Sequence, residues 1–462
     1  MTALLGAVAS AGCQVHQVRA PEEIESPVTL PSAWSSPGGD AAVARWWTAF
    51  GDARLDALMA RVEADNLTLR EALARVDAAR AAIGEADAGW WPSVDASVSA
   101  SRQRSVVLGD ARAFNLYTSQ LAARYELDLW GRVASLTEAA EWEAEATRLD
   151  AQALGMTVAA NVAEAWFTLV EQQALLALLT EHIEHNAELL DRLEQRYTAG
   201  IATAVAVSQQ RQALAATRSL VPPVEAQIAV SRHRLAVLAG AAPASLAVEA
   251  GEALPTPPAL PATGVPGEVL RRRPDVAAVQ LRAAAADARV AAALAERFPT
   301  FALSAAIGTG GPTPSALVEQ WLYSLVASLA GPIFDGGRRA AAVERRRAEV
   351  RAAIADLGQT LLTAMSEVED ALARIDRGFA RVEALEAERA VAHTLVEEAE
   401  ARYTGGLSDY LPVVTAIRSA QAADRAVLSA RRELLVQHVA LYRALGGGLT
   451  PAAPPGRDEE RR

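Results

Sequence analysis

The chain contains no lysine, a single cysteine and few aromatic residues, and these shortages exclude several classes of protein. Cys13 is the only cysteine, so no intramolecular disulfide framework can form. Aromatic residues make up only 5% of the chain, and the apolar share is mostly alanine, leucine and valine. All 44 basic residues are arginine, which we interpret as a compositional bias of the genome. The composition favours long helices that approach one another closely over a thick aromatic core.

Positive charge and long apolar runs are also scarce. The net charge of −12 and the pI near 5.2 argue against a nucleic-acid partner. No run approaches about twenty uncharged apolar residues, so we expect no membrane-spanning helix. The four methionines do not cluster, which gives no support for specialised copper handling. We find no glycine-rich phosphate loop after a strand and no nucleophile elbow, so we expect neither an enzyme nor a cofactor.

Three landmarks occur twice in the same order, about two hundred residues apart. Trp91-Pro92 is matched by Phe298-Pro299, Gly131-Arg132 by Gly337-Arg338, and Arg196-Tyr197-Thr198-Ala199-Gly200 by Arg402-Tyr403-Thr404-Gly405-Gly406. Pro92 and Pro299 are 207 positions apart, whereas the other two landmarks repeat at 206. The chain is therefore one structural unit written twice.

Each repeat predicts a helix, two strands and a pair of long helices. In the first, a helical pattern runs from Asp52 to about Ala88 and ends at Gly89-Trp90-Trp91-Pro92, because proline cannot continue a helix. Residues 94–100 and 121–129 then alternate between apolar and polar, which is typical of strands with one apolar face. We expect the polar stretch 102–112 to separate them. The second repeat predicts strands around residues 301–307 and 325–329, with a turn at 308–314.

A long helix follows each Gly-Arg landmark. In the first repeat, apolar residues recur at alternating steps of four and three, which is the seam of a left-handed coiled coil. The seam positions are Val158, Val162, Ala165, Leu169, Gln172, Leu176, Leu179, Ile183, Asn186, Leu190 and Leu193. Shifting this frame by 206 gives a second apolar seam from Ala364 to Ala399, which only Gly378 and Arg389 interrupt.

Glycines end both long helices, and the chain turns back into helices at about 204–238 and 411–445. Pro274 opens the first helix of the second repeat. We expect a signal remnant at 1–13, an extended segment at 14–50, the first repeat at 51–250, a proline-rich connector at 251–268, the second repeat at 269–448 and a disordered tail at 449–462.

Four strands per chain cannot close a barrel. An open sheet edge in lipid leaves backbone groups unpaired, at a cost of several kcal/mol each, and about eight strands are needed to fill a barrel with side chains. Two copies would give a plugged barrel, whereas three copies would give twelve strands and room for water. The charged residues Arg124, Glu126 and Asp128 on the polar side of the second strand favour three.

Several motifs, in order, resemble the TolC-like outer-membrane efflux proteins, most closely the NodT/OprM-like lipoprotein branch that serves resistance-nodulation-division (RND) pumps. They are Trp46-Trp47 with Phe50 and Asp52, Tyr125-Glu126-Leu127-Asp128-Leu129-Trp130-Gly131-Arg132, Arg273-Pro274-Asp275-Val276, Phe298-Pro299 and Phe334-Asp335-Gly336-Gly337-Arg338. The resemblance implies a mainly α-helical homotrimer with a shared twelve-strand barrel and a periplasmic α-helical barrel. It also implies a passive outer-membrane duct that docks a periplasmic membrane-fusion adaptor and an inner-membrane RND pump and conducts drugs or other small molecules.

The same resemblance implies roles for individual residues at the periplasmic tips. The adaptor-contact turns are Arg196, Tyr197 and Gly200 in the first repeat and Arg402, Tyr403 and Gly406 in the second. Members of this branch often place a leucine and, four residues later, an aspartate at the constriction. Here Leu411 is followed by Thr415, so Asp409 could supply the charged ring instead; its alternative role is a helix cap.

Cys13 follows a short apolar run and Ser10-Ala11-Gly12, so it resembles the acylation site of a bacterial lipoprotein; the alternative is a chance cysteine. Trp90, Trp91 and Trp130 fall at strand ends, where membrane barrels carry aromatic girdles, although packing of helix against barrel is a rival role. His182 and His185 lie one turn apart on a solvated helix without a third metal ligand nearby. Arg345-Arg346-Arg347 is expected to pair with Glu344 and Glu349.

Two other functions remain open at this point. A duct for protein secretion or metal export would share the fold, and a soluble coiled-coil scaffold would explain the helices without giving the strands a use. Dependence on detergent separates the two ducts from the scaffold.

Overall fold

The computed structural model describes residues 15–36, 44–107, 110–243, 245–251, 253–319 and 321–449, with the backbone alone at 105–107 and 110–112. Cys13 and the expected tail beyond Leu449 lie outside these ranges. Leu449 itself, with which that tail was expected to begin, is buried.

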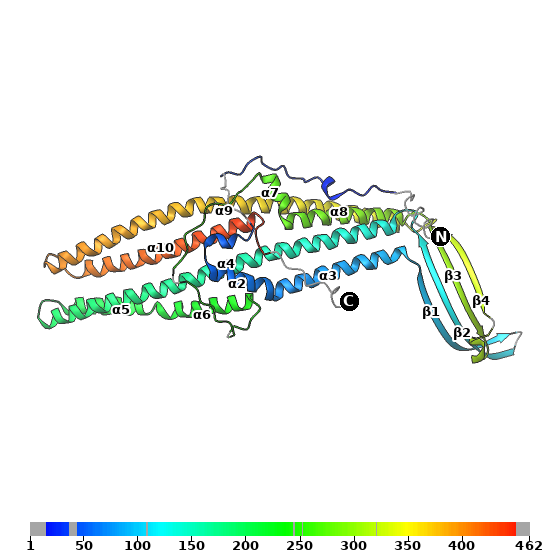
Figure 1. The fold of residues 1–462 in the computed structure, drawn as a ribbon, viewed down its shortest axis with the longest axis horizontal. Helices are drawn as coiled ribbons and strands as arrows, with labels where there is room; N and C mark the ends of the chain where they lie inside the picture. The colour runs from blue at the N-terminus through cyan, green and yellow to red at the C-terminus, as the bar shows by residue number, and fades with distance from the viewer. Residues whose placement is uncertain are drawn as a thin grey trace. The chain divides into compact units, whose positions relative to one another are not determined.

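The described chain is mainly helical with one small sheet, which confirms the predicted fold class (Figure 1). The α-helices are α2 Ala53–Asp65, α3 Leu67–Asp87, α4 Arg132–Thr198, α5 Ala204–Arg218, α6 Val221–Leu238, α7 Pro266–Arg272, α8 Pro274–Ala295, α9 Arg338–Thr404 and α10 Leu411–Ala444. The strands are β1 Ser93–Val107, β2 Asp110–Leu127, β3 Thr300–Gly311 and β4 Leu322–Ala330. Short 3-10 helices are η1 Pro21–Glu23, η2 Trp46–Phe50, η3 Ala88–Trp90 and η4 Pro314–Leu317.

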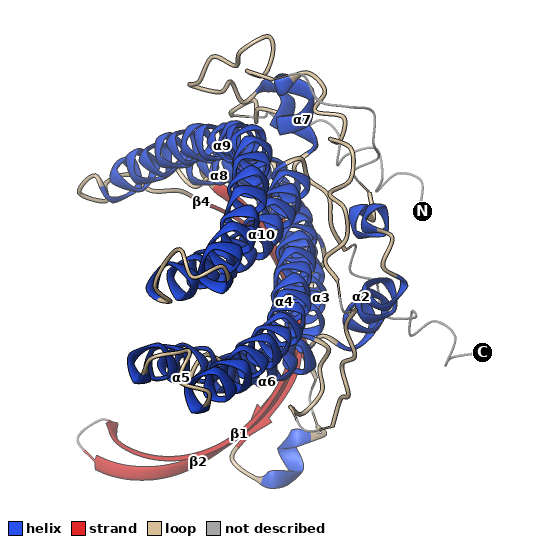
Figure 2. Cartoon of the chain, turned by 90° about the vertical axis from the view of Figure 1, so that its left-hand side faces the viewer, coloured by secondary structure: helices blue, strands red, loops and turns tan. Residues whose placement is uncertain are grey.

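The two long helices confirm the repeat. α4 and α9 have 67 residues each, and both their first and their last residues are 206 positions apart. Figures 1 and 2 show α4 beside α5 and α6, and α9 beside α10, as two helical hairpins. Every position of the two predicted seams is buried or half-buried except Arg389, which is exposed. Pro274 opens α8 as expected.

Two helices expected to be continuous are each broken in two. The segment 52–88 divides at Asn66, whose Oδ1 accepts from the Leu69 backbone N–H at 2.9 Å and whose Nδ2 donates to the Leu238 carbonyl at 2.7 Å. Asn66 therefore ends α2 and starts α3. The segment 204–238 divides at Ser219–Leu220, because Pro222 and Pro223 follow at the start of α6.

The sheet is antiparallel with strand order β1-β2-β3-β4. Its strands extend into two segments that were expected to be connectors. Residues 102–107 belong to β1 and 110–112 to β2, so the predicted polar linker is the end of a hairpin. Gly308 to Gly311 likewise belong to β3, where Gly308 lies so close to β2 that an added Cβ would meet the Ser119 oxygen at 2.7 Å. Polar or glycine-rich composition did not end these strands, because backbone pairing continued through them.

Contacts divide the chain into two compact units that combine segments of both repeats. The described part of the first comprises residues 15–28, 74–149 and 277–360 and contains the whole sheet. Its helices pack through small residues: Ala139, Ala285 and Ala288 form a buried cluster. Asp287 of α8 holds the N-terminal segment by accepting from the Arg19 backbone and side chain, both at 3.0 Å.

The second unit comprises residues 29–73, 150–276 and 361–449 of the described chain, and it holds the large apolar core. Trp46 is 1% exposed and stacks on Tyr442 with 5.4 Å between ring centroids. Asp52 caps α2 through the backbone N–H of Arg54 at 3.0 Å and accepts from the Trp166 indole at 2.9 Å. The motif before the first helix therefore ties that helix to α4 and α10.

One helix in the described chain, α4, contains a stretch long and apolar enough to cross a membrane by length and composition alone. The expectation of no membrane-spanning helix rested on the lack of a long uncharged run, and this stretch does not contradict it, because charged residues interrupt α4 at Asp150, Glu164 and Glu171. Because 67% of that stretch is buried inside the protein, it fits the core helix of a packed structure equally well.

Candidate functional site

The register of the four strands gathers apolar side chains on one face of the sheet. Directly opposed residues in antiparallel strands point to the same side, and the pairs Tyr125↔Leu303, Leu121↔Ile307 and Leu303↔Ala327 carry one apolar face across three strands. Ala96↔Leu121 extends it to β1. The members of this face are Val94, Ala96, Val98, Ala100, Leu121, Ala123, Tyr125, Leu127, Phe301, Leu303, Ala305, Ile307, Tyr323, Leu325, Ala327 and Leu329.

This apolar face is exposed. Tyr323, Leu325 and Leu329 are 87%, 79% and 68% exposed, and Val98 is 74% exposed. The opposite face carries mainly serine, threonine, glutamine, alanine and charged side chains, for example in the pairs Ser97↔Gln120 and Arg124↔Ser304, and in β4 it also carries Leu322 and Val326. A sheet with one bare apolar face and one polar face separates hydrocarbon from water. The alternation predicted from the sequence is thus confirmed.

Two of the expected lumen charges stabilise the junction between β2 and α4. Glu126 forms a double hydrogen bond with the Arg132 guanidinium, both contacts at 3.1 Å, and Asp128 accepts from the Ala134 backbone N–H at 2.9 Å. These contacts fix where the strand stops and the helix begins. Arg124 is exposed.

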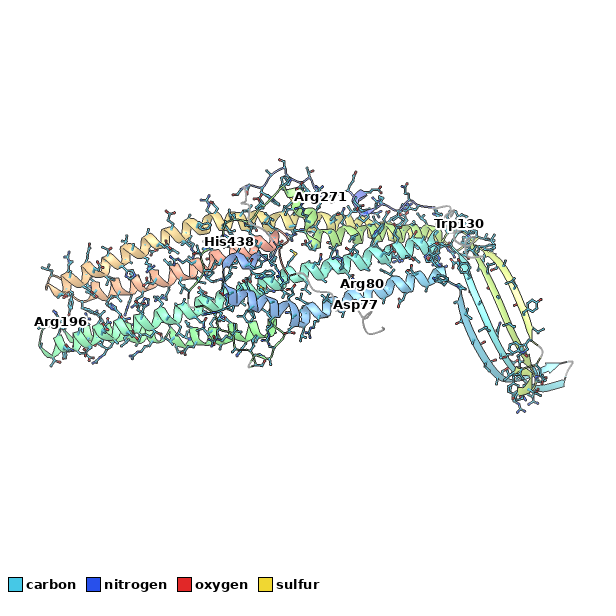
Figure 3. The ribbon with its side chains drawn as sticks, viewed as in Figure 1. Asp77, Arg80, Trp130, Arg196, Arg271 and His438 are labelled. Atoms are coloured by element: carbon cyan, nitrogen blue, oxygen red, sulfur yellow. The ribbon has the colours of Figure 1, made fainter. Side chains whose placement is uncertain are left out.

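The three tryptophans at the strand ends differ in their surroundings. Trp130 stacks on Phe298 with ring centroids 4.9 Å apart and donates from its indole to the Pro299 carbonyl at 2.6 Å. It lies at the end of β2, as labelled in Figure 3. Trp91 is 74% exposed, and Trp90 is half-buried. Trp130 thus joins the end of the first repeat's second strand to Phe298-Pro299 of the second repeat, whereas the ring of Trp91 is exposed.

The two hairpin turns have the same backbone geometry. Gly200 and Gly406 adopt φ of 75° and 72°, a left-handed conformation that favours glycine. Gly200 N–H donates to Tyr197 and Ile201 N–H to Arg196, while the second turn repeats both bonds 206 residues later. This is the Schellman closure of a helix end, so both Arg-Tyr-x-x-Gly motifs form turns as the sequence predicted.

The tips of the two hairpins contact each other within one chain. The Arg196 guanidinium, at the end labelled in Figure 3, lies 5.3 Å from the centre of the Tyr403 ring. Tyr403 packs edge-on against Tyr410, whose hydroxyl donates to Gln210 at 2.8 Å. Burial, with Tyr403 and Glu400 nearby, raises the pKa of Tyr410, so its hydroxyl stays a donor. Arg418 of α10 also donates to Gln212 of α5.

The expected gate residues lie at the start of α10, and their side chains are exposed. Leu411 is its first residue and is 56% exposed. The Thr415 hydroxyl donates to the Leu411 carbonyl at 2.8 Å, within its own helix. No side chain caps α10, and the exposed Asp409 carboxylate has no hydrogen-bond or ion-pair partner in the described chain. The capping role considered for Asp409 is absent here.

Sequence reasoning missed Gln210, Gln212 and Arg418, because nothing in a single chain marks which helices will meet. The one signal in the sequence was the spacing of Gln212 and Arg418, which are 206 positions apart and so occupy matching places in the two repeats. The arginine cluster behaves as predicted: Arg345 and Arg346 pair with Glu349, and Arg347 with Glu344. His182 contacts Asp424 at 3.2 Å, a partner that the sequence did not reveal. Among the described residues, no group of three potential ligands could hold a metal ion.

A four-stranded sheet with one exposed apolar face, together with two long helical hairpins in one chain, defines the class: a TolC-like outer-membrane channel. The model of the family described as outer membrane efflux protein matches residues 58–241 and again 265–447. The pyoverdine export outer membrane protein OpmQ of Pseudomonas aeruginosa is 31% identical over 446 residues, which are 93% of each chain. The toluene efflux pump outer membrane protein TtgC of Pseudomonas putida is 31% identical, over 87% of this chain and 85% of that protein.

Solved structures agree. The outer-membrane channel OprN is similar with a TM-score of 0.85 and 31% identity, over 92% of this chain and 98% of that one. The chain belongs to the outer membrane efflux protein family, and it is the outer-membrane channel component of an efflux system. The resemblance found in the sequence motifs is confirmed.

Proposed function

We propose that three copies of this chain form one passive duct that carries small molecules from a periplasmic adaptor and an inner-membrane pump to the outside. The observation that carries this proposal is the two-faced sheet. Its apolar face is exposed over all four strands, and β1 and β4 each pair on one side only within the described residues. Such edges are costly in lipid, since each unpaired backbone group costs several kcal/mol.

A barrel made from three copies gives both faces of the sheet a suitable environment. Joining β4 of one copy to β1 of the next pairs the open edges and turns the apolar face to lipid. About eight strands fill their own barrel with side chains, so twelve leave an aqueous lumen for the polar face. Reconstitution of the purified protein in a planar bilayer tests the duct: we expect discrete conductance steps, and a protein that binds the bilayer without conducting would contradict the proposal.

We assign adaptor contact to the hairpin tips, at Arg196, Tyr197, Gly200 and their repeat partners Arg402, Tyr403 and Gly406. Exposed apolar side chains at matched positions support this assignment. They are Ile201 and Leu407, which are 65% and 74% exposed. Repeated apolar knobs on a turn suit a partner that binds both hairpins alike. Loss of adaptor co-purification in an Ile201→Ser, Leu407→Ser variant would support it, and undiminished recovery would remove it.

We further propose that Leu411 and Asp409, three copies of each, narrow the closed duct. The exposed side chain of Leu411 and the unpartnered carboxylate of Asp409 support this role. Thr415 is less suited, because its hydroxyl bonds to its own helix. Leu411→Ala and Asp409→Ala should widen conductance, whereas Thr415→Ala should not. Unchanged conductance in both of the first two variants would refute the gate.

We also propose roles at the membrane for the tryptophans at the strand ends and for Cys13. Trp91, with Trp90 beside it, is assigned to the membrane interface, and Trp130 reaches the same level while holding the Phe298-Pro299 turn. Cys13 is proposed as the acylated, palmitate-bearing anchor, on the small residues that precede it. Mass spectrometry of the mature N-terminus tests this: an unmodified Cys13, or an intact segment before it, would rule out the anchor.

The cargo class is proposed from chemistry and kinship together. Named relatives export pyoverdine or toluene, so small organic molecules are the expected class. Expression of the channel in a strain that lacks its own outer-membrane efflux component should restore resistance to small toxic compounds when the matching adaptor and pump are present.

A further inference from the structure

A histidine and aspartate cluster joins three helices of the second unit. One carboxylate oxygen of Asp424, on α10, lies 3.2 Å from Nε2 of His182, on α4, and forms a hydrogen bond with it. The other carboxylate oxygen forms hydrogen bonds with His393 at 3.0 Å and with Arg389 at 2.9 Å, both on α9. His182 comes from the first repeat and Asp424 from the second, so this contact ties the two helical hairpins together.

The cluster lines a cavity of about 390 Å³. His182 is 7% exposed, and the residues that line the cavity with it belong to α4, α9 and α10. The other charged or titratable groups around it are Glu181 and His185 on α4, Glu397 and Glu400 on α9, and Arg425 on α10. The site therefore mixes carboxylates, arginines and histidines, and histidine is the side-chain type whose ordinary pKa lies between about pH 5 and 8.

One nitrogen of His182 lacks a partner. Nε2 contacts Asp424, whereas Nδ1 is buried without a hydrogen-bond partner among the described residues. A neutral imidazole with its proton on Nε2 fits this arrangement, because Nδ1 then carries no hydrogen. The imidazolium form would bury a charged N–H donor without an acceptor, which disfavours protonation of His182 in this arrangement.

We propose that His182 and Asp424 form an acid-released latch that holds the two helical hairpins of one chain together. Neutral His182 closes the latch, and protonation of His182 opens it. The inference rests on the proposed function only in its consequence: released hairpins move apart at their tips and widen the closed duct.

The direction of the pH effect follows from proton linkage. Burial lowers the pKa of His182, and this outweighs the opposing pull of Asp424. The latched state thus binds fewer protons than a released state in which His182 is exposed, so latching weakens as the pH falls. The loss begins near the ordinary histidine value of 6.5 and continues down to the lowered pKa. Each unit between the two pKa values changes the ratio of latched to released chains about tenfold.

Spin labels at Thr198→Cys and Thr404→Cys, the exposed last residues of α4 and α9, measure tip separation directly. The full chain carries Cys13→Ser so that only these thiols react, and labelled chains are diluted with unlabelled ones so that one chain is read at a time. A chelator in every buffer removes metal ions. Lowering the pH from about 7.5 to about 5.5 spans the histidine range, and we expect longer separations at the lower pH.

Matched variants decide which histidine acts. His182→Gln keeps a side-chain donor but does not titrate, so the tips should stay together at both pH values. His185→Gln, one turn away, is exposed and should respond like the parent protein. Asp424→Asn should enlarge the acid response, because protonated His182 then loses its carboxylate in the latched state, so protons favour the released state more strongly.

The latch would be overturned by an acid response that survives His182→Gln, by shorter separations in acid, or by no change in the parent protein. Conductance at the same pH values is a separate readout. A protein that never conducts would contradict the proposed duct, while tip separation would still decide the latch.

Discussion

Asn186 interrupts the apolar seam of α4 and is fully buried. Its Nδ2 donates to the Thr217 hydroxyl at 3.2 Å, and it accepts from Gln210 through its carbonyl at 2.8 Å and its side chain at 3.1 Å. Gln210 in turn accepts from Tyr410 at 2.8 Å. A buried polar layer of this kind fixes the register of helices, because a shifted register leaves these groups unpaired.

We expect Gln210→Ala to lower the free energy of unfolding by about 1–3 kcal/mol, because it removes the donor to the Asn186 side-chain oxygen and the acceptor of the Tyr410 hydroxyl. Denaturant unfolding followed by helical circular dichroism measures the change. Gln209→Ala, on the neighbouring half-buried position, is the control and should change the midpoint little. Equal losses in the two variants would refute the network.

His438 predicts a second, separate sensitivity to acid. It is 0% exposed on α10, its Nδ1 donates to the Leu434 carbonyl at 2.9 Å, and burial lowers its pKa. The folded state therefore binds fewer protons than the unfolded state, so the stability from neutral His438 is full above about pH 6.5 and is lost as the pH falls through the lowered pKa.

Thermal unfolding between about pH 7.5 and 5 covers that window and measures the effect. His438→Leu should lose less stability in acid than the parent, while His233→Leu, at an exposed position of α6, should lose as much as the parent. An acid loss in His438→Leu as large as in the parent would contradict this role.

At the scale of elements, helices were predicted well where one hydrophobic period continued over many turns. They were predicted poorly where the contacts of a single side chain ended a helix. α4 and α9 carry a seam over many turns, so their existence and bounds were evident. Asn66 broke a helix because its side chain found both a backbone donor and the Leu238 carbonyl. The second of these partners is 172 residues away in the chain, so no local pattern contains it.

Strand ends were predicted less well for a related reason. Residues 102–105 are polar at every position and so lack alternation, which is typical of a connector, but they belong to β1 and pair with β2 in an extended hairpin. Alternation shows a strand only where its faces meet different environments. A strand whose faces are both polar is invisible to this criterion.

Neighbouring residues of β4 test the assignment of the two faces. Leu325 lies on the apolar face, opposite Ala305, and Ser324 lies on the polar face, opposite Ala306. Leu325→Arg should block membrane insertion, because arginine on the lipid face costs about 2–4 kcal/mol near the bilayer middle. Ser324→Arg should insert normally. Outer-membrane fractionation with heat-modifiability on gels compares them, and equal insertion of both would reverse or remove the assignment.

At the scale of the whole molecule, the sequence revealed the duplication, the channel class and the shortage of strands. It did not reveal the contacts between the two hairpins. Tyr410 with Gln210, Arg418 with Gln212 and Asp424 with His182 each join residues about 200 or more apart. Their residue types are ordinary for solvated helices, so only the folded arrangement identifies them. Of the proposed site, the turns were predictable and the links between them were not.

The central claim is that one chain cannot seal its own sheet and must share a barrel with two others. Native mass spectrometry of the protein released from detergent micelles tests this most directly. The account predicts a particle of three chains, each 48.6 kDa for the full sequence, that falls apart when β1 or β4 is disrupted. A stable, folded single chain that conducts by itself would contradict it.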